Sequence, residues 1–379
     1  MNKNNYLSTG LITYIGNKRS LVSEIEKCVI DIKKELKKDK LVSFDGFAGS
    51  GVVSRMLKYH SSVLFINDME EYSNIINQCY LTEPSEEKRL QIQHYIKELN
   101  QLDFNKEGII CKEYSPKETD NIQNGERAFY TRENALIIDT IRNKIDDYPD
   151  EYFNYLISPL LVKASINVNT SGVFKGFHKK KGIGHFGGKN EDNTTTRITK
   201  KIVLDPPLFS DQDHKCKVFF RNQDINTLIP TLGEFDITYL DPPYNQHPYG
   251  SNYFMLNIIL KNEITGDLSD VSGIPDNWNR SNYNYKKSAL KSMKDLLKII
   301  KSKYIILSYN DEGIISKSQM IQLFNELDLG YILKEIEYDT YKGCKNLKNR
   351  NKKVTEYIWI IYPLYKYPEP YDLIPIDLW

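Results

Sequence analysis

Residues 41–68 hold the feature that constrains the fold most. Two apolar runs, 41–44 and 63–66, have the length of buried strands, and a glycine-rich turn and a helical segment lie between them. Parallel strands need a crossover connection of this kind, whereas antiparallel strands do not. We therefore expect an α/β fold with helices covering the faces of a mostly parallel sheet.

This alternation is interrupted by a long segment of different character. Residues 84–165 read as polar and mostly helical, and residues 166–216 are rich in Gly, Lys, Asn and Thr. Strands are then expected at 218–220, 235–240, 304–307 and 357–361, with a long helix over 282–301. We predict one α/β domain, formed by residues 1–104 and 217–379, that is split by an insertion at 105–216.

Composition excludes several classes of protein. With 27% charged and 40% hydrophobic residues, the chain is typical of globular proteins and not of disordered ones. A net charge of +1 excludes a polycation but not a local DNA-binding patch. The five cysteines form no CxxC pair, which favours a reducing cytoplasm. No apolar run is long enough for a membrane span or a signal peptide, and we expect no metal site.

The sharpest motif is Asp241, Pro242, Pro243 and Tyr244, directly after the run 235–240. Ligand sites of α/β sheets lie at this end of the strands. The two prolines stiffen the loop and offer no backbone donor, so the loop carbonyls act only as acceptors. A carboxylate beside such a carbonyl suits an amino group, and Tyr244 offers a face for a planar base. Residues 205–208 also begin Asp-Pro-Pro but end in Leu, and we interpret them as an ordinary turn.

The turn 45–51 contains Gly46, Gly49 and Gly51, which fit either close approach to a ligand or simple helix packing. Asp68 ends the next strand, about 20 residues further on, the usual reach to ribose hydroxyls in nucleoside-binding folds. The same residue also fits a helix N-cap. Residues 14–18 precede the first helix and, taken alone, indicate a turn.

The insertion contains a basic stretch. Residues 175–201 carry seven Lys and one Arg against two acids, and glycines and aromatics are interleaved with them. This pattern fits either a solvated lysine loop or a loop that contacts phosphates and reaches a groove. We expect Lys175, Lys179, Lys180, Lys181, Lys189 and Arg197 to bind DNA, and Asn167, Asn169, Thr170 and Ser171 to read base edges.

Together and in this order, these elements resemble the Dam-like, alpha-class adenine-specific DNA methyltransferases of restriction-modification systems. The resemblance covers essentially the whole chain. It implies methyl transfer from S-adenosylmethionine to the exocyclic amine of an adenine flipped out of a short duplex site. It also implies a Rossmann-like, S-adenosylmethionine-dependent methyltransferase fold with three layers. Residues 105–216 would be the target recognition domain, residues 1–104 the cofactor-binding part and residues 217–379 the target adenine part.

The resemblance also assigns roles to individual residues. Asp241, Pro242 and Tyr244 would hold the target base as the catalytic group. Cofactor-binding roles fall to Tyr14 and Lys18 at the methionine end, Asp45, Phe47, Gly49 and Gly51 along the pocket, Asp68 at the ribose and Asp224 at the adenine. Gly46 stands where relatives often carry Pro, and Ile225 where they often carry an aromatic residue.

The expected partner is double-stranded DNA, with a cognate restriction endonuclease as a functional rather than a physical partner. We expect a monomer or weak dimer in the cytoplasm, associated with the nucleoid through DNA. Two alternatives remain open. One is a methyltransferase with the same pocket that acts on RNA adenine or a protein glutamine, although Asp241 favours DNA over these. The other is a non-catalytic DNA-binding relative.

Overall fold

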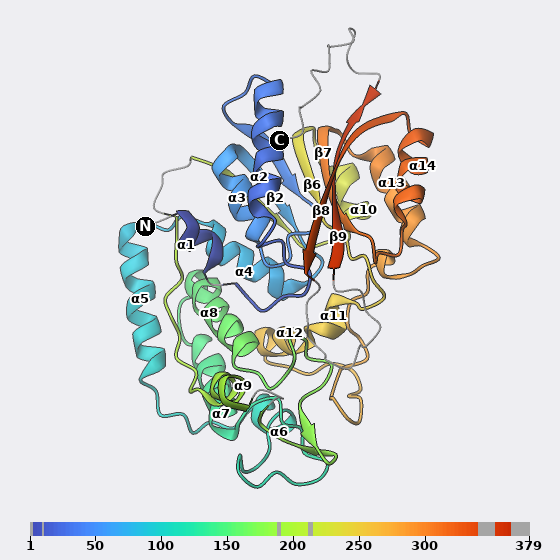
Figure 1. Cartoon of the computed structure of the whole chain (residues 1–379). Helices are drawn as coiled ribbons and strands as arrows, with labels where there is room; N and C mark the ends of the chain where they lie inside the picture. Colours follow the sequence, from blue (N-terminus) through green and yellow to red (C-terminus); the bar gives the residue numbers. More distant parts are fainter. Residues whose placement is uncertain (1–2, 10, 188–190, 211–214, 340–352, 365–379) are drawn as a thin grey trace.

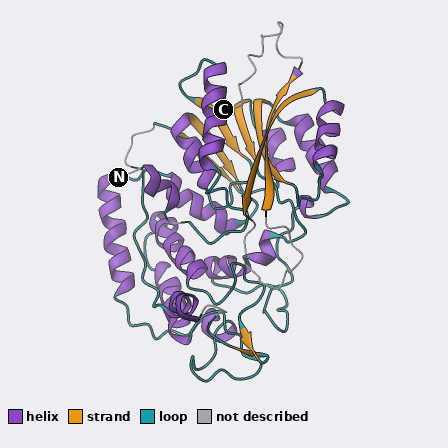
Figure 2. Ribbon diagram, in the orientation of Figure 1, coloured by secondary structure: helices purple, strands orange, loops and turns teal. Residues whose placement is uncertain are grey.

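A computed structural model describes the chain except for residues 1–2, 10, 188–190, 211–214, 340–352 and 365–379. Its centre is a seven-stranded sheet in the order β5-β2-β1-β6-β7-β9-β8 (Figures 1 and 2). The strands are β1 (Leu41–Asp45), β2 (Ser61–Asn67), β5 (Lys217–Arg221), β6 (Phe235–Leu240), β7 (Ser302–Asn310), β8 (Leu329–Asp339) and β9 (Lys353–Pro363).

The first five of these strands in space, β5 to β7, run parallel, and β9 is antiparallel to both of its neighbours. β1 pairs with β2 on one side and β6 on the other, so Asp45 lies between Ile66 and Tyr239. The chain therefore reverses its direction of winding at β1, and a crevice forms at the carboxyl ends of β1 and β6.

Helices cover both faces of the sheet. The amphipathic helices α2 (Val22–Glu35) and α3 (Val52–His60) pack against one face. On the other face lie α10 (Ile225–Leu228), α13 (Ala289–Ile299) and α14 (Lys317–Glu326). The expected helix over 282–301 begins later, at Ala289, because 282–284 form a 3₁₀ turn. The result is the three-layer α/β fold that the sequence predicts.

A helical region with its own apolar core lies below the sheet in Figure 1. It contains α4 (Glu71–Leu81), α5 (Glu86–Asn100), α6 (Ile109–Glu113), α7 (Arg132–Ile145), α8 (Phe153–Ile166) and α12 (Phe254–Lys261). Because α4, α5 and α12 lie outside residues 105–216, the insertion shares its core with both flanking parts of the chain.

The smaller elements are α1 (Lys3–Ser8), α9 (Glu191–Thr199), α11 (Tyr249–Asn252), the 3₁₀ turns Asp150–Tyr152, Ile229–Thr231 and Asn282–Asn284, and a hairpin of β3 (Lys179–Lys180) and β4 (Ile183–Gly184). The hairpin lies at the end of the helical region farthest from the sheet (Figures 1 and 2). Within the described part of the chain, no helix combines the length and apolar character that a membrane span requires.

Candidate active site

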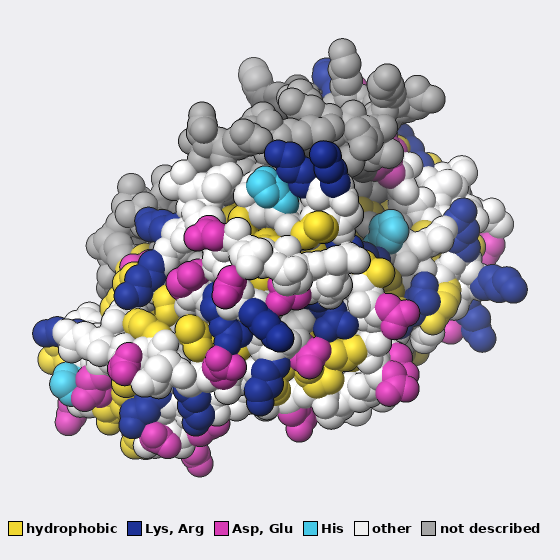
Figure 3. All heavy atoms as spheres, turned by 90° about the horizontal axis from the view of Figure 1, so that it is seen from below, with side chains coloured by type: hydrophobic (Ala, Val, Ile, Leu, Met, Phe, Trp, Pro, Cys, Tyr) yellow, Lys and Arg dark blue, Asp and Glu magenta, His cyan; other side chains and the backbone are white. Residues whose placement is uncertain are grey.

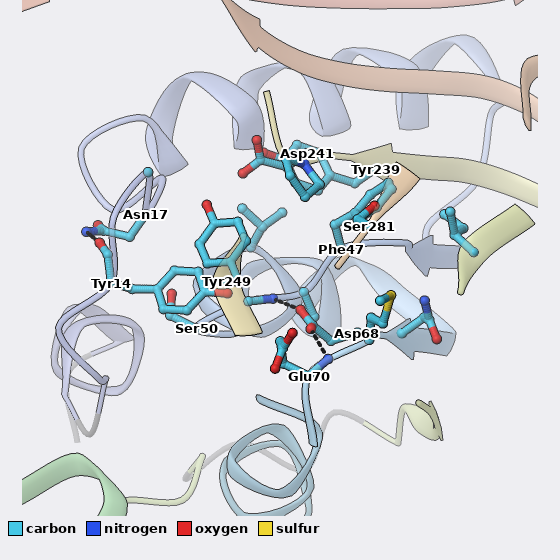
Figure 4. A pocket seen from close by; sticks show the side chains of 18 of the residues that line it. Tyr14, Asn17, Phe47, Ser50, Asp68, Glu70, Tyr239, Asp241, Tyr249 and Ser281 are labelled. Atoms are coloured by element: carbon cyan, nitrogen blue, oxygen red, sulfur yellow. Dashed lines mark hydrogen bonds between the residues drawn. The ribbon is translucent and has the colours of Figure 1, made fainter. Parts of the chain in front are cut away.

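A cavity opens where β1, β2 and β6 end, and its empty space is about 800 Å³ when the open mouth is included (Figure 4). Seven of the residues predicted from the sequence line it: Tyr14, Lys18, Phe47, Gly49, Asp68, Asp224 and Asp241. Asp45, Gly51, Pro242 and Tyr244 are each within two residues of one that lines it. The fold thus gathers the predicted site from distant parts of the chain.

The glycine turn is fixed by both backbone geometry and Asp68. Gly49 and Gly51 have φ angles of 51° and 77°, which side chains rarely allow, and a Cβ on Gly51 would lie 2.0 Å from Asn77 Oδ1. The backbone N–H of Gly49 donates to Asp68 Oδ2 at 2.7 Å, and that of Glu70 donates to Oδ1 at 2.8 Å (dashed in Figure 4). Asp68 therefore ties the turn after β1 to the start of α4.

Two further carboxyl groups at this end of the site are poorly hydrated. Burial raises the pKa of Asp45 to about 7, although its Oδ2 accepts a hydrogen bond from Ser54 Oγ at 2.6 Å. Burial, and then the charge of Asp68, raise the pKa of Glu70 to about 8. Glu70 lines the cavity, and its Oε2 accepts a hydrogen bond from Asn257 Nδ2 at 3.2 Å. A carboxyl group with such a pKa can both donate and accept hydrogen bonds near neutral pH.

Tyr14 forms part of an aromatic stack beside the glycine turn. Its ring lies parallel to those of Tyr249 and Tyr253, with both centroid distances 4.8 Å. A Cβ on Gly49 would come within 2.9 Å of the Tyr14 ring, so the absence of a side chain at Gly49 lets the two segments meet. The stack gives the cavity a flat apolar wall.

Lys18 links the cavity to a buried pair of carboxylates. Its Nζ lies 2.9 Å from Asp241 Oδ1 and 3.2 Å from Glu356 Oε1, and it donates to the carbonyl of Gly16 at 3.2 Å. Burial alone would lower the pKa of Lys18, but Asp241 and Glu356 outweigh burial and raise it. Burial raises the pKa of Asp241, and Lys18 opposes that rise. The ammonium group therefore favours the ionised form of Asp241 at a largely desolvated position.

The loop after β6 is held from several sides. The backbone N–H of Ile314 donates to the carbonyl of Tyr244 at 2.8 Å, and Asn284 Nδ2 donates to that of Asn245 at 2.8 Å. The ring of Tyr244 meets that of Tyr309 edge-on at 5.9 Å. Pro242 is buried, and the side chain of Asp241 retains 17% exposure. The loop thus presents Asp241 to the cavity from a fixed backbone.

Asp224 and Phe47 lie at the end of the cavity near β5. Asp224 caps α10, with its Oδ1 accepting hydrogen bonds from the backbone of Asn226 and Thr227. Here the two departures from the family pattern meet, because a Cβ on Gly46 would lie 2.4 Å from Ile225 Cδ1. The small residue at 46 therefore makes room for the branched one at 225.

The comparison with known proteins agrees with this geometry. Residues 14–323 match the family described as MethyltransfD12, the D12 class N6 adenine-specific DNA methyltransferases. The chain belongs to this family. Among its relatives, the type II methyltransferase M.NlaIII of Neisseria lactamica is 30% identical over 360 residues, which cover 92% of this chain and 99% of that protein.

Two other relatives have a similar identity to this chain. The type II methyltransferase M.CviAII of Paramecium bursaria Chlorella virus 1 is 29% identical over 358 residues, covering 93% of this chain and 98% of that protein. The modification methylase StsI of Streptococcus sanguinis is 32% identical over 367 residues, covering 92% of this chain but 51% of that protein. The predicted Rossmann-like methyltransferase fold and the adenine-specific DNA methyltransferase activity are therefore confirmed.

The second Asp-Pro-Pro sequence lies apart from the D12 site. Asp205 does not line the cavity; its carboxylate pairs with Lys163 at 2.6 Å on the surface. In the described part of the chain, no three His, Cys, Asp or Glu side chains cluster as a metal site would require. The Asp-Pro-Pro sequence is therefore part of the site only where it follows a buried strand that ends at the cavity.

The basic residues of the insertion occupy different environments. Lys179, Lys180 and Lys181 are exposed on the hairpin, and Lys175 is half-buried. Arg197 donates to the carbonyls of Ile166 and Thr170, which holds that turn together. Lys189 lies outside the described residues.

The expectation that Asn167 and Asn169 read base edges is contradicted. Both side chains are buried, and their amides donate to the carbonyls of Arg197 and Lys200 for Asn167 and of Ala128 and His185 for Asn169. These asparagines hold the loops of the insertion in place.

Two residues at the site, Glu356 and Glu70, escaped the sequence analysis. A signal existed for Glu356, because it falls between Val354 and Ile358 on the apolar face of a strand, where an acid needs a buried cation. Glu70 carried no such signal, since it stands in an acidic pair that reads as the exposed start of a helix.

Proposed function

We propose that this chain methylates the exocyclic amine of adenine in a short duplex DNA site, using S-adenosylmethionine bound in the cavity. The observation that carries the proposal is the common cavity wall. Asp241 faces the same space as the glycine turn and Asp68 (Figure 4). An amine held at Asp241 and a nucleoside-containing cofactor held at the glycine turn would therefore lie side by side.

The residues present fit such a cofactor. Backbone groups of the glycine turn, the carboxyls of Asp68 and Glu70, and Asp224 offer polar partners for a nucleoside, while Phe47 and Tyr14 offer apolar faces. When bound, S-adenosylmethionine supplies an electrophilic methyl group on a sulfonium that is already a good leaving group. The remaining task of the protein is to position and activate the amine.

Asp241 and Pro242 would activate that amine. Its lone pair is conjugated with the purine ring, which makes it a poor nucleophile. Two acceptors at its hydrogens, the Asp241 carboxylate and the Pro242 carbonyl, favour a pyramidal nitrogen with a localised lone pair. The base must leave the duplex to reach the pocket, and stacking on Tyr244 would return about 1–3 kcal/mol of the cost of flipping.

Lys18 and Glu356 would tune this acceptor. An isolated carboxylate at a desolvated position would take up a proton and cease to be a pure acceptor. Lys18 favours the ionised form of Asp241, and the same ammonium also contacts Glu356. In this arrangement Lys18 serves Asp241 directly, in addition to the cofactor role that the sequence predicts.

Residues 105–216 would recognise the DNA target. The face of the molecule seen from below carries intermixed basic and acidic side chains, with basic groups beside histidines next to the grey atoms (Figure 3). Lys175 and the hairpin residues Lys179, Lys180 and Lys181 are placed to meet phosphates. Arg197 would act indirectly, by holding the turn at 166–170.

The remaining partner assignments are part of the proposal. Double-stranded DNA is the substrate, and a restriction endonuclease of the same specificity would be a functional partner, as the type II class of the relatives suggests. We propose a monomer or weak dimer that works in the cytoplasm on nucleoid DNA.

The test is methyl transfer from labelled S-adenosylmethionine to duplex DNA, RNA and glutamine peptides in parallel. Only DNA should be labelled, at adenine. We expect Asp241→Asn to lower turnover by about 10²–10³-fold, the effect of losing one preorganised polar partner, with cofactor affinity retained. Asp205→Asn, in the same three-letter context, is the matched control and should behave as wild type. Normal turnover of Asp241→Asn would overturn the mechanism.

A further inference from the structure

Two cationic side chains and a histidine gather outside the cavity, on the side where residues 279–284 line it. Lys175 Nζ lies 3.4 Å from His247 Nδ1, and Arg280 lies near enough for its charge to lower the pKa of Lys175. His247 follows Tyr244 by three residues, and Arg280 stands between Asn279 and Ser281, which line the cavity. We call Lys175, His247 and Arg280 the mouth cluster.

The protein holds the mouth cluster in place through its backbone. Ser272 Oγ donates to the carbonyl of Lys175 at 2.7 Å, and the neighbouring Phe174 N–H donates to the carbonyl of Asn252 at 2.8 Å. Asn252 Nδ2 in turn donates to the carbonyl of His247 at 3.4 Å. Loops from the insertion and from the catalytic part are thereby joined at this point.

The Arg280 side chain is preordered by aromatic rings. Its guanidinium lies 4.2 Å from the ring centroid of Tyr285 and 5.6 Å from that of Trp278. Stacking of this kind fixes the plane of the guanidinium and leaves its N–H edges for other partners. A planar set of donors on an exposed loop suits bidentate binding of an anion.

No described carboxylate forms an ion pair with Lys175, His247 or Arg280, although most other basic groups near the helical region have one. Burial and the charge of Arg280 lower the pKa of Lys175, and burial and Lys175 lower that of His247. The charges of Lys175 and Arg280 repel each other without a counter-ion, so the arrangement costs stability unless an anion joins it.

We propose that the mouth cluster binds a phosphodiester group of the target strand next to the flipped adenosine. This inference rests on the proposed function. A flipped base enters the cavity while its sugar-phosphate remains at the mouth, because only the sugar separates the base from the backbone. The phosphate would supply the missing negative charge, and it would fix the depth at which the base enters.

The test compares Lys175→Gln/Arg280→Gln with Lys34→Gln, an exposed lysine on α2 that serves as the matched control. For a duplex containing the methylated site, the double variant should bind about 10–100-fold more weakly, and its log K against log salt slope should fall by about 1. Its affinity for S-adenosylmethionine and its thermal midpoint should match those of the control. Arg280→Lys should retain the slope, because the charge remains.

Neutral methylphosphonates, placed singly along the target strand, locate the contact. One beside the adenine should weaken binding by the wild type and leave the double variant unaffected. If wild type methylates DNA but the double variant behaves as Lys34→Gln, or if both proteins lose equally from the methylphosphonate, the inference is wrong. If wild type methylates no duplex at all, the proposed function fails first, so the two failures are distinguishable.

Discussion

The shared ion pair at Lys18 predicts strongly non-additive effects on stability. Its ammonium faces Asp241 at 2.9 Å and Glu356 at 3.2 Å in an almost dry environment. Asp241→Asn or Glu356→Gln alone leaves one carboxylate opposite the cation. The double variant Asp241→Asn/Glu356→Gln leaves none, and the amides preserve the shape of both side chains.

The magnitude follows from the local charge. Each single change takes the buried group from a net charge of −1 to 0, so we expect it to alter the free energy of unfolding by about 1 kcal/mol or less. The double variant should lose about 3–5 kcal/mol, because a buried cation then lacks a partner. This loss of stability cannot exceed about 5 kcal/mol, because at that cost Lys18 would release its proton at pH 7 and become neutral. The coupling energy should therefore be at least about 1 kcal/mol, and about 3 kcal/mol or more where the single changes are close to neutral.

Urea unfolding of the four proteins at pH 7, followed by tryptophan fluorescence, measures this coupling. Lys38 and Lys303 provide a comparison pair around Asp236, because both contact Oδ1 of that buried carboxylate, at 2.8 and 3.0 Å, while their own side chains are 40% and 46% exposed. The cycle Lys38→Gln/Lys303→Gln should show a smaller coupling than the cycle at Lys18, because both lysines lie partly in solvent and the Asp236 carboxylate also accepts a hydrogen bond from the backbone N–H of Val42. Additive effects at Asp241 and Glu356 would refute the shared-cation arrangement.

Two further predictions concern the cofactor end of the cavity. Glu70 ionises from about pH 4.5 in the unfolded chain but only near pH 8 in the folded chain, so the free energy of unfolding should fall as pH rises through this range. Glu70→Gln should remove this loss of stability. Denaturant midpoints should show that the variant is more stable than wild type at pH 8 but not at pH 4. Gly51→Ala should lower the free energy of unfolding by about 1–3 kcal/mol and weaken cofactor binding in calorimetry, because the φ of Gly51 is 77° and a Cβ there would lie 2.0 Å from Asn77. Gly233→Ala is the control and should have little effect, because no atom lies within 4 Å of the new Cβ.

The parallel part of the sheet could be predicted from the sequence because its strands are buried on both faces. Apolar runs such as 304–307 are typical of such strands, and all six residues of β6 are buried, Asp236 and Thr238 included. The antiparallel edge was harder to recognise. The strand β8 (Leu329–Asp339) was not predicted, because glycine and charged residues (Gly330, Lys334, Glu335 and Glu337) interrupt its apolar residues.

The site was predictable where backbone chemistry determines the motif. Glycines with positive φ and a proline-stiffened loop are local requirements, so the residue types alone indicate them in the sequence. Glu356 and Glu70 depend instead on tertiary contacts. The first is buried because β9 inserts beside β7, and the second because Asn257 of α12 packs over it. No local pattern specifies either contact.

The three charges around Lys18 also explain why the whole chain must fold before the site exists. Lys18 precedes the first long helix, Asp241 ends β6, and Glu356 lies on the last strand. A lone carboxylate in this place would be neutral, and a carboxylate with a dedicated cation would have its oxygens satisfied before an amine arrived. One ammonium shared by two carboxylates opposes both outcomes, because it favours the ionised form of Asp241 while its charge is divided between Asp241 and Glu356. The catalytic acceptor is therefore a property of the completed sheet, and the Asp-Pro-Pro-Tyr loop alone cannot supply it.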